Sequence, residues 1–390
     1  MKKVHLKRLA SNRVKKGYPV LTELDIYNQE DAKEGDLIRL IDPKKKFVGI
    51  GYLGEENSNI GWVLSTKDRE INKGFILEKL SEAKKYRRVF FENEDTTAFR
   101  VFNGHGDGIG GMTIDYYNGF YVVSWYNKGI YQHRELILET FKDIFVHAKG
   151  VYEKSNFPDS EVKNQHLFGK EAPEPLIIKE NGINYATYLN DSWMTGIFFD
   201  QREVRYDIMT QYGVGKNVLN LFSYTGAFSV AATMGGALKT VNIDVAKRSK
   251  ELTTEQFEVN QLNVTDHEIR VIDVESYLDY AQKHDLKFGL IVIDPPTFAR
   301  TDKGTWSVEE DYSRIISQCL NILEDDGTLI VSTNAWKLSA DDFYDIVEEG
   351  FNLAHEDGVL IDNYTIPQDY RISETYPESS YLKVFALQKD

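Results

Sequence analysis

Ile291-Val-Ile-Asp-Pro-Pro-Thr-Phe298 is the stretch that decides the fold class of this chain. Its apolar, β-branched beginning is typical of a buried parallel strand, because both faces of such a strand are covered. Two prolines cannot continue a hydrogen-bonded ladder, so the strand must end at Asp294. Asp294, Pro295 and Phe298 are therefore expected at the carboxyl edge of a sheet, where open α/β folds bind their ligands.

Strands and helices alternate on both sides of this stretch. Apolar runs separated by helical segments predict parallel strands that are joined by helices. The expected strands cover residues 218–222, 240–243, 269–271, 290–293 and 328–332. The expected helices cover residues 227–234, 247–260, 274–284 and 307–323. This order predicts an α/β fold with a doubly wound parallel sheet.

The first 180 residues follow other patterns. Residues 36–41 and 47–53 are short β-like runs joined by a Pro- and Lys-containing turn, which predicts a small barrel-like module. The next region combines a helical stretch at 74–91, a strand at 120–126 and a helix at 134–145. We therefore expect three domains, which cover residues 1–72, 73–180 and 181–390.

The composition limits the classes of function. The chain has 46 basic and 61 acidic residues and a formal charge of −15, so any surface for nucleic acid must be a local patch. A basic run opens the chain, and a solvated, mobile terminus is its simplest interpretation. The residues of this run are Lys2, Lys3, Lys7, Arg8, Arg13, Lys15 and Lys16.

The single cysteine, Cys319, allows neither an intrachain disulfide nor a cysteine-based metal site, and we expect no metal. No apolar run is long enough to span a membrane, and no signal-peptide core follows the basic start. These features predict a cytoplasmic protein that has no membrane partner.

Three carboxylates follow successive predicted strands. Asp244 comes 18 residues after Gly226 (244 − 226), close to the spacing at which an acidic residue meets ribose hydroxyls. Asp273 and Asp294 end the next two strands. Asp244 or Asp273 alone would be read as a helix cap. Three acids beside a glycine turn favour a ligand site, and the turn after residues 218–222 lacks the G-x-G-x-x-G spacing, which argues against a pyrophosphate cradle there.

Six motifs in a fixed order carry a resemblance to a known family. They are Gly35 to Asp42, Phe47-Val-Gly-Ile-Gly-Tyr52, Val101 to Asp115, Thr195-Gly-Ile-Phe-Phe-Asp-Gln-Arg202, Asn220-Leu-Phe-Ser-Tyr-Thr-Gly-Ala-Phe228 and Asp294-Pro-Pro296. With them the chain resembles the bacterial S-adenosylmethionine-dependent methyltransferases of large-subunit (23S) ribosomal RNA, of the cytosine-C5 type. This resemblance implies an N-terminal PUA-like barrel, a small α+β middle domain and a Rossmann-like methyltransferase domain.

The resemblance also implies a cofactor site for S-adenosylmethionine. Asp200, Gln201 and Arg202 would hold its methionine end, although a helix start with surface charge is the alternative for these three. The turn formed by Phe222, Ser223, Tyr224, Thr225 and Gly226 would pass beneath the cofactor. Asp244 would bind the ribose, Asp273 with Val274 would bind the adenine, and Asp294 would lie beside them.

The chain departs from the cytosine-C5 enzymes at the nucleophile. Those enzymes attack cytosine C6 with a thiolate, but the strand ending at Ser332 continues here as Thr333-Asn-Ala-Trp-Lys337 without cysteine. The helical spacing around Cys319 indicates a packed core position. Asp294 to Phe298 and Ser332-Thr-Asn334 are more similar to a guanine-N7 methyltransferase module. Guanine N7 bears a lone pair and no proton, so alignment alone can support methyl transfer.

Several interpretations stay open at this point. Phe298 would stack on the target base or pack in the core, while Asp294, the Pro295 carbonyl or Asn334 would bond to the base edge. Arg300 and Lys337 would contact phosphates. Cytosine-C5 methylation through another residue, amino-group methylation and a silent RNA-binding assembly factor are the alternatives. The expected partner is 23S ribosomal RNA or a large-subunit precursor, and a homodimer is possible.

Overall fold

The structure is a computed structural model of the 390-residue chain. It describes all residues except 159, 161–162, 192–193 and 302–303, and it does not describe the side chains of residues 299–301 and 304–305. The contacts divide the chain into two units. One contains Met1–Lys179, Thr187–Thr195 and Gln368–Ser379, and the other contains Glu180–Ala186, Gly196–Pro367 and Ser380–Asp390. The three predicted domains remain a proposal.

The N-terminal part of the first unit is a six-stranded sheet in the order β2-β6-β5-β4-β1-β3. Its strands are β1 (Lys2–Leu6), β2 (Val20–Thr22), β3 (Ile26–Asn28), β4 (Leu37–Ile41), β5 (Phe47–Glu56) and β6 (Asn59–Ser65), with helix α1 (Arg8–Lys15) after β1. The prediction of a solvated, mobile terminus is wrong. Val4, Leu6, Ala10 and Val14 are buried in one apolar cluster, because their spacing places them on the inner faces of β1 and α1.

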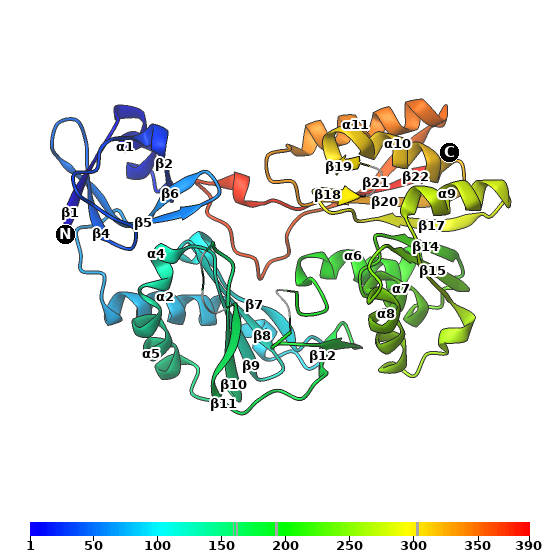
Figure 1. Ribbon diagram of the computed structural model, residues 1–390, viewed down its shortest axis with the longest axis horizontal. Helices are drawn as coiled ribbons and strands as arrows, with labels where there is room; N and C mark the ends of the chain where they lie inside the picture. The colour runs from blue at the N-terminus through cyan, green and yellow to red at the C-terminus, as the bar shows by residue number, and fades with distance from the viewer. Residues whose placement is uncertain (159, 161–162, 192–193, 302–303) are drawn as a thin grey trace. The chain divides into compact units, whose positions relative to one another are not determined.

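A second sheet of the first unit has the order β11-β10-β9-β8-β7 (Figure 1). Its strands are β7 (Ala98–Asn103), β8 (Met112–Tyr117), β9 (Phe120–Trp125), β10 (Gly150–Ser155) and β11 (Asn164–Gly169). The helices of this region are α2 (Lys73–Tyr86), α3 (Arg88–Phe91), α4 (Lys128–Tyr131) and α5 (Arg134–Ile144). The strands β12 (Leu176–Glu180) and β13 (Ile183–Thr187) form a separate two-stranded sheet.

The segment that was predicted as one helix at 74–91 forms two helices, α2 and α3, which are separated at Arg87. The Arg87 guanidinium is fully buried and donates to both carboxylate oxygens of Asp107 at 2.6 and 2.7 Å. It also donates to the Asp369 carbonyl at 2.7 Å, which ties the Gln368–Ser379 segment into this unit. A buried charge requires such partners, and no sequence periodicity reveals them.

The second unit carries a seven-stranded sheet in the order β16-β15-β14-β17-β20-β22-β21. The strands are β14 (Asn217–Leu221), β15 (Lys239–Asp244), β16 (Glu268–Val271), β17 (Phe288–Ile293), β20 (Leu323–Thr333), β21 (Gly358–Tyr364) and β22 (Lys383–Lys389). The first five are parallel, which confirms the predicted doubly wound sheet, whereas β22 runs antiparallel to β20 and to β21.

Helices cover both faces of this sheet (Figure 1). The helices of the unit are α6 (Arg202–Asp207), α7 (Ala227–Met234), α8 (Ser249–Glu258), α9 (Val274–Lys283), α10 (Val308–Leu320) and α11 (Ala340–Ala354). A short hairpin, β18 (Phe298–Thr301) with β19 (Gly304–Ser307), precedes α10. Ile291 and Ile293 face α9, α10 and α11, while Leu290 and Val292 face α6 and α7. Alternate side chains of β17 thus enter opposite cores, which explains its continuous apolar sequence.

Candidate functional site

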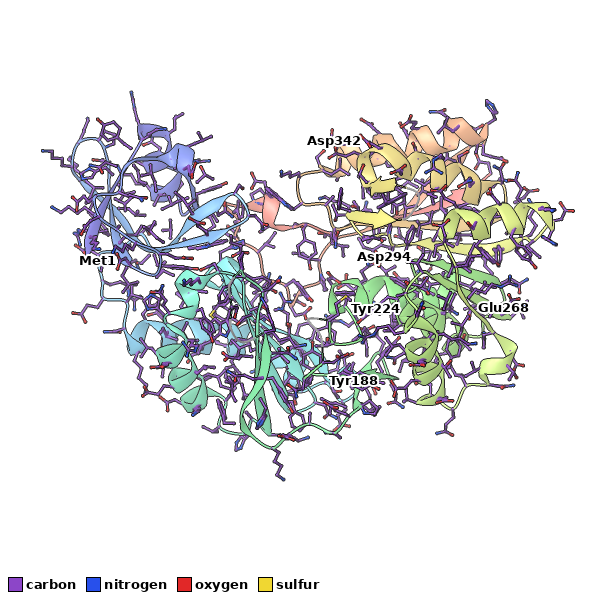
Figure 2. All side chains as sticks on the ribbon, in the orientation of Figure 1. Met1, Tyr188, Tyr224, Glu268, Asp294 and Asp342 are labelled. Carbon is purple, nitrogen blue, oxygen red and sulfur yellow. The ribbon has the colours of Figure 1, made fainter. Side chains whose placement is uncertain are left out.

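The carboxyl ends of the parallel strands bring the predicted site residues to one edge of the sheet. In the sheet register, Leu221 of β14 pairs with Ile243 of β15 on one side and with Ile293 of β17 on the other. Ile293 in turn pairs with Val331 of β20. The segments that follow these strands therefore emerge side by side. They begin at Phe222, at Val245 directly after Asp244, at Asp294 and at Asn334 (Asp294 is labelled in Figure 2).

The loop after β14 has a strained backbone. Phe222 and Tyr224 have φ angles of 57° and 50°, which side chains with a Cβ rarely adopt, and Gly226 has a φ of 76°. A Cβ on Gly226 would lie 2.6 Å from the Thr253 side chain, so glycine is required there. The loop is held by a hydrogen bond from the Thr225 hydroxyl to the Gly196 carbonyl at 2.7 Å. Such strain is found where a loop approaches a ligand closely.

Asp244 fastens this loop to the neighbouring strand. Its carboxylate accepts from the Tyr224 amide at 2.9 Å and from the Ala246 amide at 2.8 Å. Because α8 begins only at Ser249, Asp244 does not cap that helix, and the capping alternative is wrong for this residue. Asp244 is half-buried, and each of its two oxygens accepts one of these amides.

Asp273 caps a helix, which is the role that the sequence suggests for this residue taken alone. It is the N-cap of α9, and its carboxylate accepts from the Ser276 amide at 3.1 Å. The capping interpretation is therefore confirmed for Asp273, and one of its carboxylate oxygens accepts both the amide and the hydroxyl of Ser276. Val274, the first residue of α9, is 5% exposed and packs in the core.

The Asp294 carboxyl is the centre of a polar cluster at the end of β17. The Gln201 side-chain amide donates to Asp294 Oδ1 at 2.9 Å, and the Ser332 hydroxyl donates to the same oxygen. Burial raises the pKa of the Asp294 carboxyl, while the hydrogen bonds from Ser332 and Gln201 lower that pKa. Asp294 is thus a desolvated carboxyl that is fixed through one of its two oxygens.

The segment before α6 supplies Gln201 to this cluster. Gln201 and Arg202 are each 6% exposed, so the alternative of ordinary surface charge is wrong for both. Asp200 accepts a hydrogen bond from the Tyr381 hydroxyl at 2.6 Å. The Gln201 Oε1 atom is buried and has no hydrogen-bond partner among the residues that the structure describes. A buried acceptor without a donor is costly, and a bound ammonium or hydroxyl group would satisfy it.

A buried ion pair holds this segment in place. The Arg205 guanidinium donates to the two carboxylate oxygens of Glu180 at 2.6 and 2.9 Å. It also donates to the carbonyl of Phe198 at 2.6 Å. The ring of Phe198 lies 5.5 Å from that of Tyr224, centroid to centroid, so the segment and the loop after β14 are in contact.

The loop after Asp294 displays an aromatic ring. Phe298 is 56% exposed, so the alternative of core packing is wrong for this residue. Pro295 is buried, and the Pro296 carbonyl accepts from the Trp306 indole N–H at 2.9 Å. The Thr297 hydroxyl donates to the Asn334 side-chain oxygen, so the loops after β17 and β20 are bonded to each other.

Three other residues singled out in the sequence lie elsewhere or are not fully described. Cys319, on α10, is completely buried in the hydrophobic core, which confirms the packed position. This burial raises the pKa of its thiol. Lys337 is exposed, with its ammonium 5.4 Å from the centroid of the Trp336 ring. Arg300 belongs to β18, but its side chain lies outside the described residues.

Sequence reasoning gave no role to Ser332 and did not single out Tyr381. Ser332 stood in a quoted motif, yet nothing in the motif shows that its hydroxyl points at Asp294. Tyr381 reaches Asp200 across 181 positions of sequence, and no local pattern signals such a contact.

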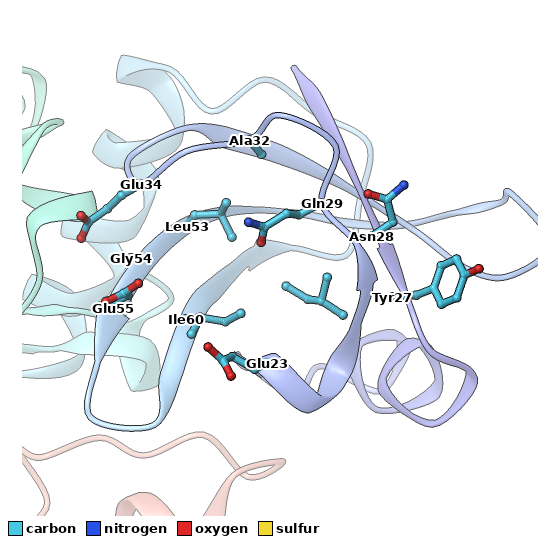
Figure 3. A pocket seen from close by; sticks show the side chains of 11 residues that line it. Glu23, Tyr27, Asn28, Gln29, Ala32, Glu34, Leu53, Gly54, Glu55 and Ile60 are labelled. Carbon is cyan, nitrogen blue, oxygen red and sulfur yellow. The ribbon is translucent and has the colours of Figure 1, made fainter.

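The N-terminal sheet presents two differently charged surfaces. A pocket there is lined by Glu23, Glu34 and Glu55 together with apolar side chains, and it does not suit a phosphate group (Figure 3). On and beside α1, the side chains of Lys7, Arg8 and Lys16 are exposed and form no ion pair among the described residues. Arg13 and Lys15, by contrast, form ion pairs with Asp25 and Asp42.

Comparisons with known proteins agree with this architecture. A family model for S-adenosylmethionine-dependent methyltransferases matches residues 143–356, and a model for PUA-like domains matches residues 4–66. The chain belongs to the S-adenosylmethionine-dependent methyltransferases. Its cofactor is therefore S-adenosylmethionine, as predicted, and its N-terminal sheet is PUA-like.

Individual relatives of this methyltransferase cover most or all of the chain. It is 42% identical, over the full length of both chains, to "Putative ribosomal RNA large subunit methyltransferase YwbD" of Bacillus subtilis. It is 30% identical to "Ribosomal RNA large subunit methyltransferase I" of Aliivibrio fischeri over 83% of this chain and 82% of that protein.

A solved structure is also similar over the full length. "Crystal structure of SMU.776, a putative methyltransferase complexed with SAH" superimposes with a TM-score of 0.94 at 39% identity, and each chain is covered completely. Among the described residues of the methyltransferase, no helix is long and apolar enough to cross a membrane.

Proposed function

We propose that this methyltransferase modifies a base of large-subunit (23S) ribosomal RNA, or of its precursor, and that the methylated atom is guanine N7. Both named relatives are described as ribosomal RNA large subunit methyltransferases, and the PUA-like domain is of a kind that suits RNA. The observation that carries the choice of atom is the location of the only thiol. Cys319 is completely buried and its pKa is raised by burial, so it supports no attack on cytosine C6.

The cofactor would be held by the loops at the carboxyl edge of the sheet. Asp244 would accept from the ribose hydroxyls, and Asp273 with Val274 would meet the adenine. The buried acceptor Gln201 Oε1 suits the ammonium of the methionine end, and Asp200 and Arg202 flank it in sequence. Phe222 to Gly226 would pass beneath the cofactor, where the strained backbone allows close approach.

The reaction needs alignment more than proton transfer. When bound, S-adenosylmethionine would supply an electrophilic methyl group, and guanine N7 would need no base to accept it because N7 bears an in-plane lone pair and no proton. Holding the two reactants in line supplies most of what such a step requires. The residues of this chain therefore bind, orient and exclude water, and they form no covalent bond to the RNA.

The target base would be recognised by the loops after β17 and β20. Phe298 offers a free ring on which a flipped base can stack. The Asn334 side-chain oxygen is engaged by Thr297, so its N–H₂ group is left to donate to a carbonyl such as guanine O6. Asp294 Oδ2 and the Pro295 carbonyl are candidate acceptors for the donors of the base. The Asp294 carboxylate would also offset the positive charge that N7 methylation places on the ring.

Phosphate contacts are assigned to exposed basic residues. Lys7, Arg8 and Lys16 at the PUA-like domain have no ion-pair partner among the described residues and would bind the RNA backbone, as would Lys337. We also propose from the family resemblance that two copies can associate, which sedimentation analysis would test.

Nucleoside mass spectrometry tests this function. Ribosomal RNA from cells with and without the gene is digested and compared, and the purified protein is then given labelled cofactor and the unmodified RNA. Loss and restoration of 7-methylguanosine is the expected result. A change in 5-methylcytidine instead would refute the choice of guanine N7. Absence of any change, together with absence of S-adenosylmethionine binding in calorimetry, would favour an assembly factor without catalytic activity.

A further inference from the structure

The second unit, which carries the methyltransferase sheet, covers nearly all of its described Phe and Trp side chains, with three exceptions, and one tyrosine ring, Tyr206 on α6, is also exposed at 48%. Among its described Phe and Trp side chains, the exposed ones are Phe198, Phe298 and Trp336, at 49, 56 and 44%. All three lie on segments at the carboxyl edge of the sheet, where the site residues gather. Exposed rings that cluster at one edge mark a surface for a partner, because scattered exposure would show no such preference.

Two of these rings stand on loops that are bonded to each other. Thr297, next to Phe298 in sequence, donates its hydroxyl hydrogen to the side chain of Asn334, two positions before Trp336. The Trp306 indole N–H fixes the first loop through the Pro296 carbonyl at 2.9 Å. Phe298 and Trp336 therefore stand close in sequence to the two residues that bond the loops together.

The turn that carries Trp336 is anchored on both sides. Thr333 and Leu338 are buried, at 1 and 8% exposure. The Ala335 carbonyl accepts from the Leu338 amide at 3.1 Å and from the Lys383 ammonium at 2.8 Å. The backbone of this turn is thus fixed while the indole projects outward. Exposing a large apolar ring to water is unfavourable, so an ordered turn that holds such a ring outward points to a role for the ring in binding.

We propose that Phe298 and Trp336 form a stacking surface for two unpaired nucleotides, in which Phe298 holds the target base and Trp336 holds a neighbouring base. This inference rests on the proposed function and names its substrate class, a single-stranded or opened RNA segment. Bases in a duplex are stacked on both faces, so they are not available to side-chain rings. Lys337, with its ammonium 5.4 Å from the Trp336 ring centroid, supplies a positive charge for the connecting phosphate.

The test measures binding and does not depend on methyl transfer. The probes are a short mixed-sequence single-stranded RNA and the same sequence in a duplex, each added to the full-length protein with S-adenosylhomocysteine. Trp336→Ala should weaken binding of the single strand about 5- to 150-fold, the range for losing one stacked base. Trp336→Phe should keep most of the affinity. The control Leu353→Ala removes a side chain of similar exposure, 53%, on α11 and should bind as the wild type does.

A second readout reports stacking directly. The single-stranded RNA should quench part of the tryptophan fluorescence of the wild type, and Trp336→Phe should lack that part of the quenching. Equal binding by Trp336→Ala and wild type, or equal affinity of the wild type for the duplex, would overturn the proposal. Loss of binding in Trp336→Ala without any methylation by the wild type would support the stacking surface and refute only the proposed function.

Discussion

The substitution Asp294→Asn distinguishes the roles of the two carboxyl oxygens of Asp294, at the centre of the site. The hydrogen bonds from Gln201 and Ser332 both end on Oδ1, and asparagine keeps that oxygen as an acceptor. The change therefore replaces only Oδ2, the oxygen assigned to the substrate, with an N–H₂ group. The buried negative charge is also lost, so the free energy of unfolding should stay equal to or exceed that of the wild type.

The expected effect on catalysis follows from the lost acceptor. A hydrogen bond to a charged group is worth about 1.5–3 kcal/mol, which corresponds to about a 10- to 150-fold decrease in kcat/KM. The assay is transfer of labelled methyl to unmodified ribosomal RNA, with urea unfolding measured on the same preparations. Activity of Asp294→Asn within twofold of the wild type would refute the role of Oδ2.

Ser332→Ala is the matched variant for Asp294→Asn. Because burial raises and the Ser332 hydroxyl lowers the pKa of Asp294, removing that hydroxyl should raise the pKa further. The acidic limb of the pH–rate profile should then move toward neutral pH, since a protonated Asp294 is inactive in this scheme. In Asp294→Asn the same limb should disappear. An unchanged limb in both variants would show that Asp294 does not control the profile.

The remaining predictions concern the thiol and the stability of the first unit. Cys319→Ala should retain methyl transfer within about threefold while lowering the unfolding free energy by about 1 kcal/mol, and loss of activity in a folded variant would revive the thiol mechanism. Arg87→Met should destabilise the protein by about 3–5 kcal/mol in urea unfolding, because the buried Asp107 loses both guanidinium hydrogen bonds and keeps only the Asn103 amide and Arg371 at 3.8 Å among the described residues, and a change below 1 kcal/mol would contradict this. Burial raises the pKa of Glu56 from its ordinary value of 4.5 to about 7, so the stability contributed by the protonated carboxyl is lost as pH rises through 7. Glu56→Gln should therefore match the wild type below pH 4.5 and exceed it by up to ~3 kcal/mol at pH 8, and an equal gain at both pH values would exclude this explanation.

Local sequence determined the five parallel strands of the methyltransferase sheet, whereas the antiparallel β21 and β22 were not predicted. The apolar run before Asp294 and the helical spacing of residues 227–234 are properties of neighbouring residues, and the structure places a strand and a helix there. The site residues at strand ends followed from the same reasoning, because parallel strands deliver their carboxyl ends to one edge. The prediction for the N-terminal run was wrong because it rested on the charges of neighbouring residues. The burial of Val4 and Leu6 instead depends on β4 and β3, which are distant in sequence and pair with β1.

Only the tertiary structure decided what each side chain at the site faces. Gln201 and Asp294 are 93 positions apart, and their hydrogen bond exists because separate loops meet at the sheet edge. The same holds for the exposure of Phe298, whose sequence neighbours left its environment open. Periodicity reports which residues share a face of one strand or helix. Burial and polar contact depend on what other elements place against that face, and that information lies far away in the chain.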